Sequence, residues 1–489
     1  MIVVVACLVT GLPIPPFASG GHVVAADCSH TWAPAGGSFA DSAFGNPANW
    51  IENVAPTSGS NVCFSTGDTT FFGLERVIET IDVADGATVV LNAGTLDLNS
   101  NSSLGGVFVA NGGRIRVGKD VTVPAGRRAG AIAGQAGTIA SSTGAVLTID
   151  GALARDGGNQ LNLDLDVVNN GDVSVDGALA LGPGRTFANT GTVTVAPGAN
   201  LTTTTITAAR FHNTGVVEFS GDTRGPDAGG VRGLQFDNDG TVRVLGGDVA
   251  LVTTGTGRGT WEIGTVGSDS CAADIGKTPT PGARLFLRPS PTVTMTGGSV
   301  TGPGCLNVWN GTADVGSDVV WAPGATEIFS ATLRVAGDRT LPQLRLGNGG
   351  KLEVVAGTAT MRGHISQTTP GQSVRFGGDG RLVVPPAFSV VHELNNGFDI
   401  AESLDVVVEG SMALTGAVTL RDSSSLVSKG AWSVGPGSTI APAPGTLLRN
   451  EGTLTVDAGT GSIMFGGGAN FDNAGTVRLV RGTLDMRVP

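Results

Sequence analysis

Short runs in which apolar and polar residues alternate recur along most of this chain. Thr192–Val195 and Thr241–Val244 are two examples, and in each the alternation places two valines on one face of an extended strand. Charged residues make up only 14% of the sequence while glycine occurs 78 times, which leaves little material for the solvated face of amphipathic helices. The pattern therefore predicts an all-β protein built from many short strands and tight turns.

A nine-residue motif, F-x-N-x-G-x-V-x-V with conservative replacements, accompanies several of these runs. Its copies begin at Val167, Phe187, Phe211, Phe236, Leu448 and Phe471, and their asparagines are Asn169, Asn189, Asn213, Asn238, Asn450 and Asn473. Neighbouring copies in the first group lie 20 to 25 residues apart. That period suits one coil of a β-solenoid and is too short for a tetratricopeptide, ankyrin or propeller-blade repeat. We therefore expect a single-stranded, right-handed parallel β-helix.

The Asn-x-Gly step of the motif predicts a corner of the coil, because asparagine and glycine tolerate a positive φ. When the same corner recurs in every coil, the asparagine side chains can line up and hydrogen-bond to one another. Such a ladder satisfies amide groups that burial would otherwise leave unpaired. We interpret the motif asparagines as structural rather than ligand-binding residues.

Residues 1–26 fit a secretory signal peptide. A short apolar run covers Ile2–Leu8, and the small residues Val24 and Ala26 match a signal-peptidase site before Asp27. The usual positively charged segment is missing, so an upstream start or a wrongly assigned terminus is the alternative interpretation. A signal peptide predicts a secreted or cell-surface protein.

The rest of the chain divides by composition. Residues 27–70 hold a large share of the aromatic residues, and we expect them to form an N-terminal cap over the first coil. Residues 71–489 should form one continuous solenoid. Prolines and tryptophans gather at residues 260–320, which we interpret as a possible loop insertion. The sequence ends within a repeat, so we expect the natural chain to continue beyond Pro489.

The cysteines indicate an oxidising compartment. Removal of the signal leaves an even number, namely Cys28, Cys63, Cys271 and Cys305. Four cysteines allow three pairings, and sequence proximity favours Cys28 with Cys63 and Cys271 with Cys305. Four free thiols are the alternative. The sequence contains no C-x-x-C and no Cys/His cluster, which argues against a zinc site.

Charge and hydropathy limit the classes of molecule that this chain is expected to bind. The formal net charge is -12, and no basic run is longer than Arg127-Arg128, so the sequence argues against nucleic-acid binding. After residue 26 no apolar stretch is long enough for a transmembrane helix. The sequence also lacks a nucleotide-binding loop and a calcium-binding nonapeptide repeat, so we expect no cofactor.

Two groups of carboxylates are candidates for chemistry, because some parallel β-helices are polysaccharide lyases or hydrolases that use paired carboxylates. Alternation would place Asp164 and Asp166 on one strand face. Asp399, Glu402 and Asp405 recur at a three-residue spacing, which is not a strand period. Both groups fit a solvated surface equally well, and we therefore assign no catalytic residue.

The histidines and tryptophans give weaker signals. His364 and His392 stand outside any known catalytic motif. His212 occupies a motif position that is alanine or aspartate in other copies, which suggests an exposed position. Trp309 or Trp321 could line a lateral groove that binds glycan without catalysis.

The motif copies resemble those of bacterial secreted β-solenoid proteins of the autotransporter-passenger and filamentous-haemagglutinin type. Trp32, Asn49-Trp50, Pro56 and Gly59–Val62 are similar to the pattern that opens many autotransporter-associated β-strand proteins, although Ser60-Asn61 replaces the usual Gly-Asp. The resemblance implies a non-catalytic adhesin or structural rod that binds a cell-surface glycan or protein. A polysaccharide-processing lyase or hydrolase, or a tail-spike-like protein, is the alternative.

Overall fold

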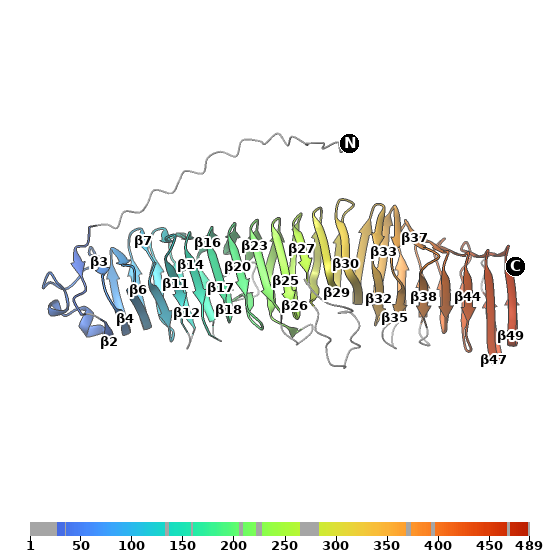
Figure 1. Ribbon diagram of the computed structural model, residues 1–489, viewed down its shortest axis with the longest axis horizontal. Coiled ribbons are helices and arrows are strands. Elements are labelled where there is room, and N and C mark those ends of the chain that lie inside the picture. The colour runs from blue at the N-terminus through green and yellow to red at the C-terminus, as the bar shows by residue number, and fades with distance from the viewer. Residues whose placement is uncertain are drawn as a thin grey trace, which may run out of the picture.

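The computed structural model describes residues 27–34, 36–132, 136–157, 160–204, 209–221, 227–264, 283–367, 373–392, 397–466 and 470–487. These residues form a long rod of stacked strands, with the N-terminal and C-terminal coils at opposite ends (Figure 1). The rod is a β-solenoid of about 18 turns, with 66% strand and 2% helix. The predicted all-β parallel β-helix is confirmed.

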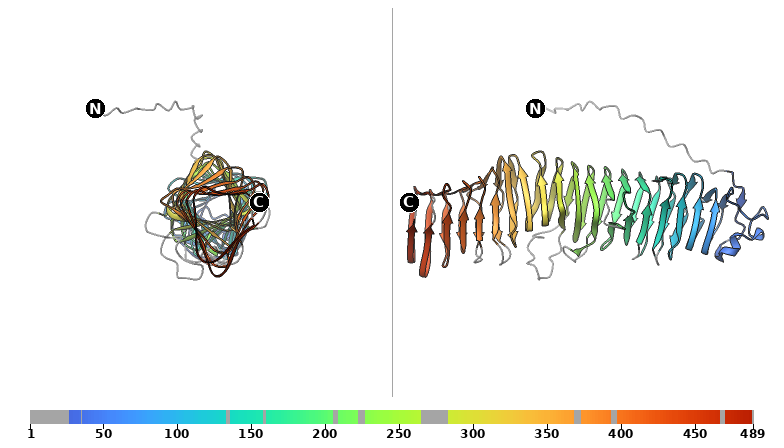
Figure 2. Two further views of the ribbon diagram at one scale, coloured as in Figure 1. Left: turned by 90° about the vertical axis from the view of Figure 1, so that its right-hand side faces the viewer. Right: turned by 180° about the vertical axis from the view of Figure 1, so that it is seen from behind.

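Each regular coil contains three strands, and the end-on view shows a three-sided outline (Figure 2). Two consecutive coils are β16 (Asp166–Asn169), β17 (Asp172–Val175) and β18 (Ala178–Leu181), followed by β19 (Thr186–Asn189), β20 (Thr192–Val195) and β21 (Asn200–Thr203). Each strand pairs in parallel with the strand three places later, so that Val167 lies opposite Phe187 and Val173 opposite Val193. Residues one coil apart therefore occupy equivalent positions.

Most strands belong to one sheet of 39 strands that follows the rod. In the C-terminal half, one face of the coils is a separate sheet of seven strands. These seven are β31 (Arg339–Leu341), β34 (Thr358–Met361), β37 (Arg381–Val384), β40 (Asp405–Val408), β43 (Ser425–Ser428), β46 (Leu447–Asn450) and β48 (Asn470–Asn473). All of the ladder pairings between these strands are parallel.

The core runs through the centre of the rod and is built from columns of like residues. Alternation turns Val173, Val193, Val217 and Val242 inward, and none of them is more than 2% exposed. The motif phenylalanines also stack, with ring centroids of Phe187 and Phe211 4.9 Å apart. Burying one such side chain contributes about 2 kcal/mol.

The N-terminal end is irregular and aromatic. It contains β1 (His30–Thr31), the short helix α1 (Asp41–Phe44), the 3-10 turn η1 (Pro47–Asn49) and β3 (Asn61–Phe64). Trp32 and Trp50 meet edge to face at 4.9 Å, and Trp32 also contacts Phe71 of the next coil at 5.1 Å. Trp32 and Trp50 are at most 2% exposed, so this segment packs directly against the first core residues.

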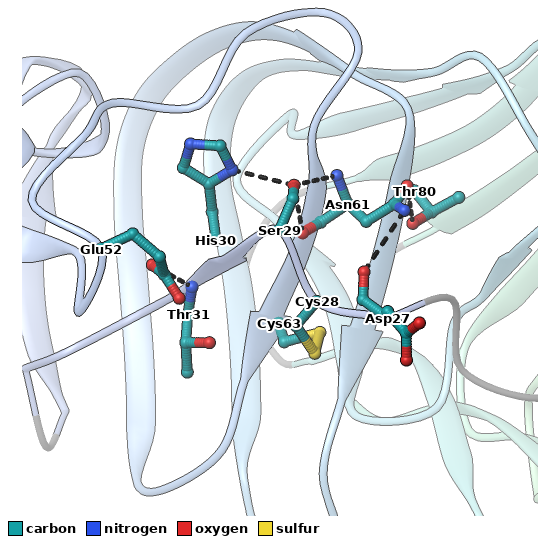
Figure 3. Close-up of a disulfide and its surroundings, with 9 residues drawn as sticks. All are labelled: Asp27, Cys28, Ser29, His30, Thr31, Glu52, Asn61, Cys63 and Thr80. Carbon is teal, nitrogen blue, oxygen red and sulfur yellow. Dashed lines mark hydrogen bonds between the residues drawn. A yellow bond between two sulfur atoms is a disulfide. The ribbon is translucent and has the colours of Figure 1, made fainter.

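A disulfide ties the first described residues to this end (Figure 3). Cys28 and Cys63 are bonded, as predicted from their proximity in sequence. Beside the bond, Ser29 Oγ donates to the Asn61 carbonyl at 3.2 Å and accepts from the Asn61 N–H at 2.8 Å. The chain that follows the predicted signal peptide is thereby fixed to β3.

The C-terminal coil is different, because its inward-facing residues lack a following coil in the described part of the chain. It contains β49 (Thr476–Arg487), which pairs in parallel with β47 (Thr453–Gly466) of the preceding coil. Leu454 and Val456 of β47 are at most 1% exposed, whereas their counterparts Val477 and Leu479 are 36% and 48% exposed.

Candidate functional site

The motif asparagines lie one above another on the inner side of a corner. Asn169 Nδ2 donates to Asn189 Oδ1, Asn189 to Asn213 and Asn213 to Asn238, each at 2.7 Å. Each of these three amides gives its second hydrogen to a backbone carbonyl at 3.1 to 3.2 Å, the acceptors being Thr192, Val216 and Thr241. No donor of these three amides is left for a ligand.

A second, shorter ladder occurs near the C-terminal end. Asn450 Nδ2 donates to Asn473 Oδ1 at 2.7 Å and to the Thr476 carbonyl at 3.2 Å. Asn169 and Asn450 begin their ladders, and the Oδ1 atom of each is buried without a hydrogen-bond partner. The ladder pattern is therefore directional, with each amide donating toward the C-terminal end.

The glycine of the motif does not act as expected. We predicted a positive φ for the Asn-x-Gly corner, but neither Asn189 nor Gly191 has one. A Cβ on Gly191 would instead lie 2.1 Å from the carbonyl oxygen of Gly171, and a Cβ on Gly215 would lie 2.2 Å from that of Gly191. Glycine is required because the backbone of the preceding coil occupies the space of a side chain.

The outer side of the same corner also carries a polar column. Asn170 Nδ2 donates to Asp150 Oδ1 at 2.9 Å, and Thr190 Oγ1 donates to Asn170 Oδ1 at 2.8 Å. Inside the corner, the carbonyl of Asn169 accepts the backbone N–H groups of both Thr190 and Gly191. The polar groups of the corner therefore form hydrogen bonds that join one coil to the next.

Asp164 and Asp166 do not share a strand face. Asp164 ends β15 (Gln160–Asp164) and Asp166 begins β16, with the buried Leu165 between them at a corner. Asp164 forms an ion pair with Arg185 at 3.2 Å, and Asp166 accepts a backbone N–H of the next coil at 2.8 Å. The predicted shared face is wrong because the chain turns at Leu165.

Asp399, Glu402 and Asp405 belong to different segments, and each has a cationic partner. Asp399 lies in β39 (Gly397–Ile400), Asp405 begins β40, and Glu402 lies in the turn between them. The ion pairs are Asp399 with Arg421 at 3.2 Å, Glu402 with Lys351 at 2.6 Å and Asp405 with Arg381 at 3.3 Å. Burial raises the pKa of Glu402, but the hydrogen bond and charge of Lys351 bring the pKa below its usual value.

The motif position shared by Ala188, His212 and Asp237 is not uniformly exposed. Asp237 is 2% exposed, and its carboxylate accepts hydrogen bonds from Arg210 Nε at 2.6 Å and Gln235 Nε2 at 2.8 Å. The expectation of a surface position is therefore wrong for Asp237. Burial of this carboxylate is tolerated because Arg210 supplies the opposite charge.

The three described histidines of interest have three different environments. His212 pairs with Asp239 at 3.2 Å, and this hydrogen bond lowers the pKa of Asp239. His364 Nδ1 lies 2.8 Å from Ser389 Oγ in an exposed pair. His392 is 1% exposed, and burial lowers its pKa to about 4. This difference could not be predicted from the sequence, because neighbouring coils decide which histidine is buried.

The segment predicted as a loop insertion contains long strands of the main sheet. Within residues 260–320 lie β27 (Thr260–Ile263), β28 (Arg284–Met295) and β29 (Ser299–Val315), while 265–282 lie outside the described residues. The strands at Thr260–Ile263, Arg284–Met295 and Ser299–Val315 therefore belong to the coils, and the rest of the predicted insertion stays a prediction. Cys271 lies outside the described residues, so its pairing with the buried Cys305 stays a prediction.

The two tryptophans proposed for glycan binding differ in exposure. Trp321 is only 5% exposed, and its Nε1 donates to Thr326 Oγ1 at 3.3 Å, so its proposed binding role is wrong. Trp309 is partly exposed, but its ring stacks on that of Phe329 at 4.2 Å.

Two grooves lie on corners of the rod. One, of about 370 Å³, is lined by residues that include His364, Phe388 and Glu409. The other, of about 320 Å³, is lined by residues that include Phe108, Arg127 and Arg128. Neither groove could be predicted from the sequence, although Arg127-Arg128, the longest basic run of the chain, lines one of them.

Comparisons with known proteins do not indicate which function this chain has. No family model matches the chain, and neither a curated protein nor a solved structure matches it. In the described part of the chain, no three or more His, Cys, Asp or Glu side chains are grouped to hold a metal ion. The described helices include none with the length and apolar character needed to cross a membrane.

Proposed function

We propose that this protein is a secreted or cell-surface β-solenoid without catalytic activity, which acts as an adhesin or structural rod of the autotransporter-passenger or filamentous-haemagglutinin type. The observation that carries the proposal is that the polar side chains considered as candidate sites form contacts between coils. The asparagine ladder, the outer polar column and the candidate carboxylates all make contacts that join one coil to another.

A rod of this kind presents a long lateral surface on which a ligand can bind many times. The Cys28–Cys63 disulfide supports an oxidising location, where such bonds persist. The net charge of -12 favours solubility over association with nucleic acid. The partner in this proposal is a glycan or a protein on a cell surface.

A panel of acidic and neutral polysaccharides tests the proposal. The full chain is incubated with each, and two quantities are followed, namely new reducing ends and retention of the protein on the insoluble polymers. We expect retention on at least one polymer and no new reducing ends. Release of reducing ends would overturn the non-catalytic proposal and favour a polysaccharide lyase or hydrolase. Asp166→Ala would then test whether this carboxylate takes part.

A further inference from the structure

The open face of the C-terminal coil exposes part of the apolar core of the rod. The inward-facing apolar residues of β49 are Val477, Leu479, Leu484 and Met486. The residues opposite them in β47 are at most 1% exposed and are Leu454, Val456, Ile463 and Phe465. In β49, by contrast, Val477, Leu479 and Met486 are 36%, 48% and 41% exposed. Exposed apolar side chains beside a strand edge favour association, so this face is a candidate interface.

The strand β49 covers two sides of the coil. Residues 476–479 continue the side formed by β44 (Ala431–Val434), and residues 483–487 continue the side formed by β45 (Thr439–Pro442). Gly482, with a φ of +81°, lies at the bend between the two sides. The end-on view in Figure 2 looks onto this coil and shows its three-sided outline. On the edge of β49 that faces away from β47, no strand pairs with it in the described part of the chain.

A second copy of the chain fits this face through a twofold axis that passes through the bend at Gly482, perpendicular to the rod. The two β49 strands then run antiparallel, and the first side of each lies over the second side of the other. This register places Val477 opposite Met486 of the partner subunit, and Leu479 opposite Leu484 of the partner subunit. A shift by one residue would place inward-facing side chains opposite outward-facing ones, so the apolar pattern selects this register.

The same register brings opposite charges together. Arg478 lies opposite Asp485 of the partner subunit, and the twofold axis repeats this pair on the other side of the bend. Arg481 lies close to the axis, but it forms an ion pair with Asp457 of its own chain at 2.6 Å. The two copies therefore do not bring uncompensated arginines together at the axis. Charge complementarity of this kind fixes the orientation of two surfaces.

The N-terminal end offers no equivalent face. Trp32 and Trp50 pack over the first coil and are at most 2% exposed, and the Cys28–Cys63 disulfide ties this segment to β3. Head-to-tail stacking of copies would need an open face at both ends and would build a filament. Pairing of two like ends needs only the C-terminal face and closes as a dimer.

We propose that two copies of this 489-residue chain associate end to end through the open faces of their C-terminal coils, with the two β49 strands antiparallel across a twofold axis. This interface goes beyond the proposed adhesive role and does not depend on what the rod binds. The dimer is one longer rod whose two N-terminal ends point in opposite directions. It presents every lateral surface twice, which increases the avidity for a repetitive ligand.

Sedimentation velocity of the full chain at concentrations from about 1 to about 100 μM tests the proposal. We expect the mass of one chain at the lowest concentration, the mass of two chains at the highest, and no larger species. A monomer at every concentration would overturn the proposal and leave this face to a different occupant, such as a further coil or another protein. Species that grow beyond a dimer would also overturn it, because a closed twofold interface cannot propagate.

Leu479→Lys tests the apolar part of the interface. Leu479 is 48% exposed in the single chain, so the monomer tolerates lysine there, but the dimer would bury two ammonium groups opposite leucine. The dissociation constant of the dimer should rise at least about a hundredfold. The matched control is Val320→Lys at the start of β30 (Val320–Ala336), where the valine is 59% exposed outside the interface. Equal effects of the two substitutions would contradict an interface at the C-terminal face.

Charge reversal tests the twofold register. Arg478→Asp would place two aspartates opposite each other at both contacts, and Asp485→Arg would place two arginines there. Each variant alone should therefore associate at least about tenfold more weakly. A mixture of the two variants restores both contacts between opposite charges and should associate about as tightly as the unchanged chain. If the mixture stays as weak as the separate variants, the antiparallel register is wrong.

Discussion

Glycines at two kinds of corner differ in what surrounds them. At the Asn-x-Gly corner a Cβ on Gly191 or Gly215 would lie about 2 Å from a backbone oxygen of the preceding coil, and neither residue has a positive φ. In the turns at Gly86 and Gly126 a Cβ would meet nothing within 4 Å, but φ is +80° and +77°. Glycine is required at Gly191 and Gly215 by the backbone of the neighbouring coil, and at Gly86 and Gly126 by the positive φ of the residue itself.

The comparison shows that glycine can be required for two different physical reasons, namely close approach of a neighbouring backbone and a positive φ. A glycine that makes a local turn works in any chain that needs that φ. A glycine that makes room for the next coil has a function only in the stack. Substitutions can separate the two constraints, because alanine adds the same Cβ to both.

The largest effect is expected for Gly215→Ala. The added Cβ would lie 2.2 Å from the Gly191 carbonyl oxygen, so coils must separate locally and the free energy of unfolding should fall by about 4 kcal/mol. The control is Gly246→Ala, since Gly246 has neither a positive φ nor an atom within 4 Å of its added Cβ. Denaturant unfolding measures both, and equal losses would contradict the close-approach explanation.

Breaking the asparagine ladder should have the next largest effect. Asn213→Ala leaves Asn189 Nδ2 and Asn238 Oδ1 without their side-chain partners in a buried corner, which should cost about 3 kcal/mol. Asn473→Ala, at the exposed end of the shorter ladder, should cost about 1 kcal/mol or less. Amide hydrogen exchange in the two coils reports each loss locally. A larger effect at Asn473 would contradict the role of burial.

A pH titration sharpens the comparison, because asparagine and glycine corners do not titrate whereas His392 does. Burial lowers the pKa of His392 from 6.5 to about 4. Between these values the unfolded chain binds the proton more readily, so stability is fully present above pH 6.5 and is lost as the pH falls toward 4. The loss should reach roughly 3 kcal/mol.

His392→Leu should flatten the pH dependence of stability over this window. The measurement is thermal unfolding of the wild-type and variant proteins at pH values of about 7, 6, 5 and 4, and their stabilities should diverge as the pH falls. His364→Asn, which changes an exposed histidine, is the control and should leave the slope unchanged. A slope that persists in the leucine variant would show that other groups carry the pH dependence.

The smallest effect is expected for Gly126→Ala. Space is free around its Cβ, so only the backbone conformation at φ +77° is strained, at about 1 kcal/mol. Gly126→Asn should recover part of this loss, because asparagine tolerates a left-handed conformation better than alanine. Denaturant midpoints of the two variants test this order, and a more stable alanine variant would contradict it.

Much of the fold could be predicted from the sequence. The period of the motif, the alternation of valines and the asparagines at equivalent positions all depend on local geometry repeated along the chain, and the parallel stack follows from that repetition. The Cys28–Cys63 bond could be predicted from proximity. These features need little knowledge of which residues meet from distant parts of the chain.

The candidate sites were less predictable because they depend on those meetings. Alternation alone could not show that the chain turns at Leu165 and separates Asp164 from Asp166. Nor could it show that Trp321 faces the core or that Asp237 is buried beneath Arg210. The first case depends on where the chain turns, and the burial of Asp237 depends on Arg210, which lies one coil away.

By itself, the sequence determined the coil, its period and the columns of valine, phenylalanine and asparagine, because a repeated local pattern must stack in register to bury its apolar face. Only the tertiary structure showed the physical reason for the glycine two residues after each motif asparagine, and which cationic side chain pairs with each carboxylate. It also showed that Arg127, Arg128 and Phe108 line one groove. The reason is distance, because these groups meet across coils about 20 or more residues apart, and no local pattern encodes the register of their side chains.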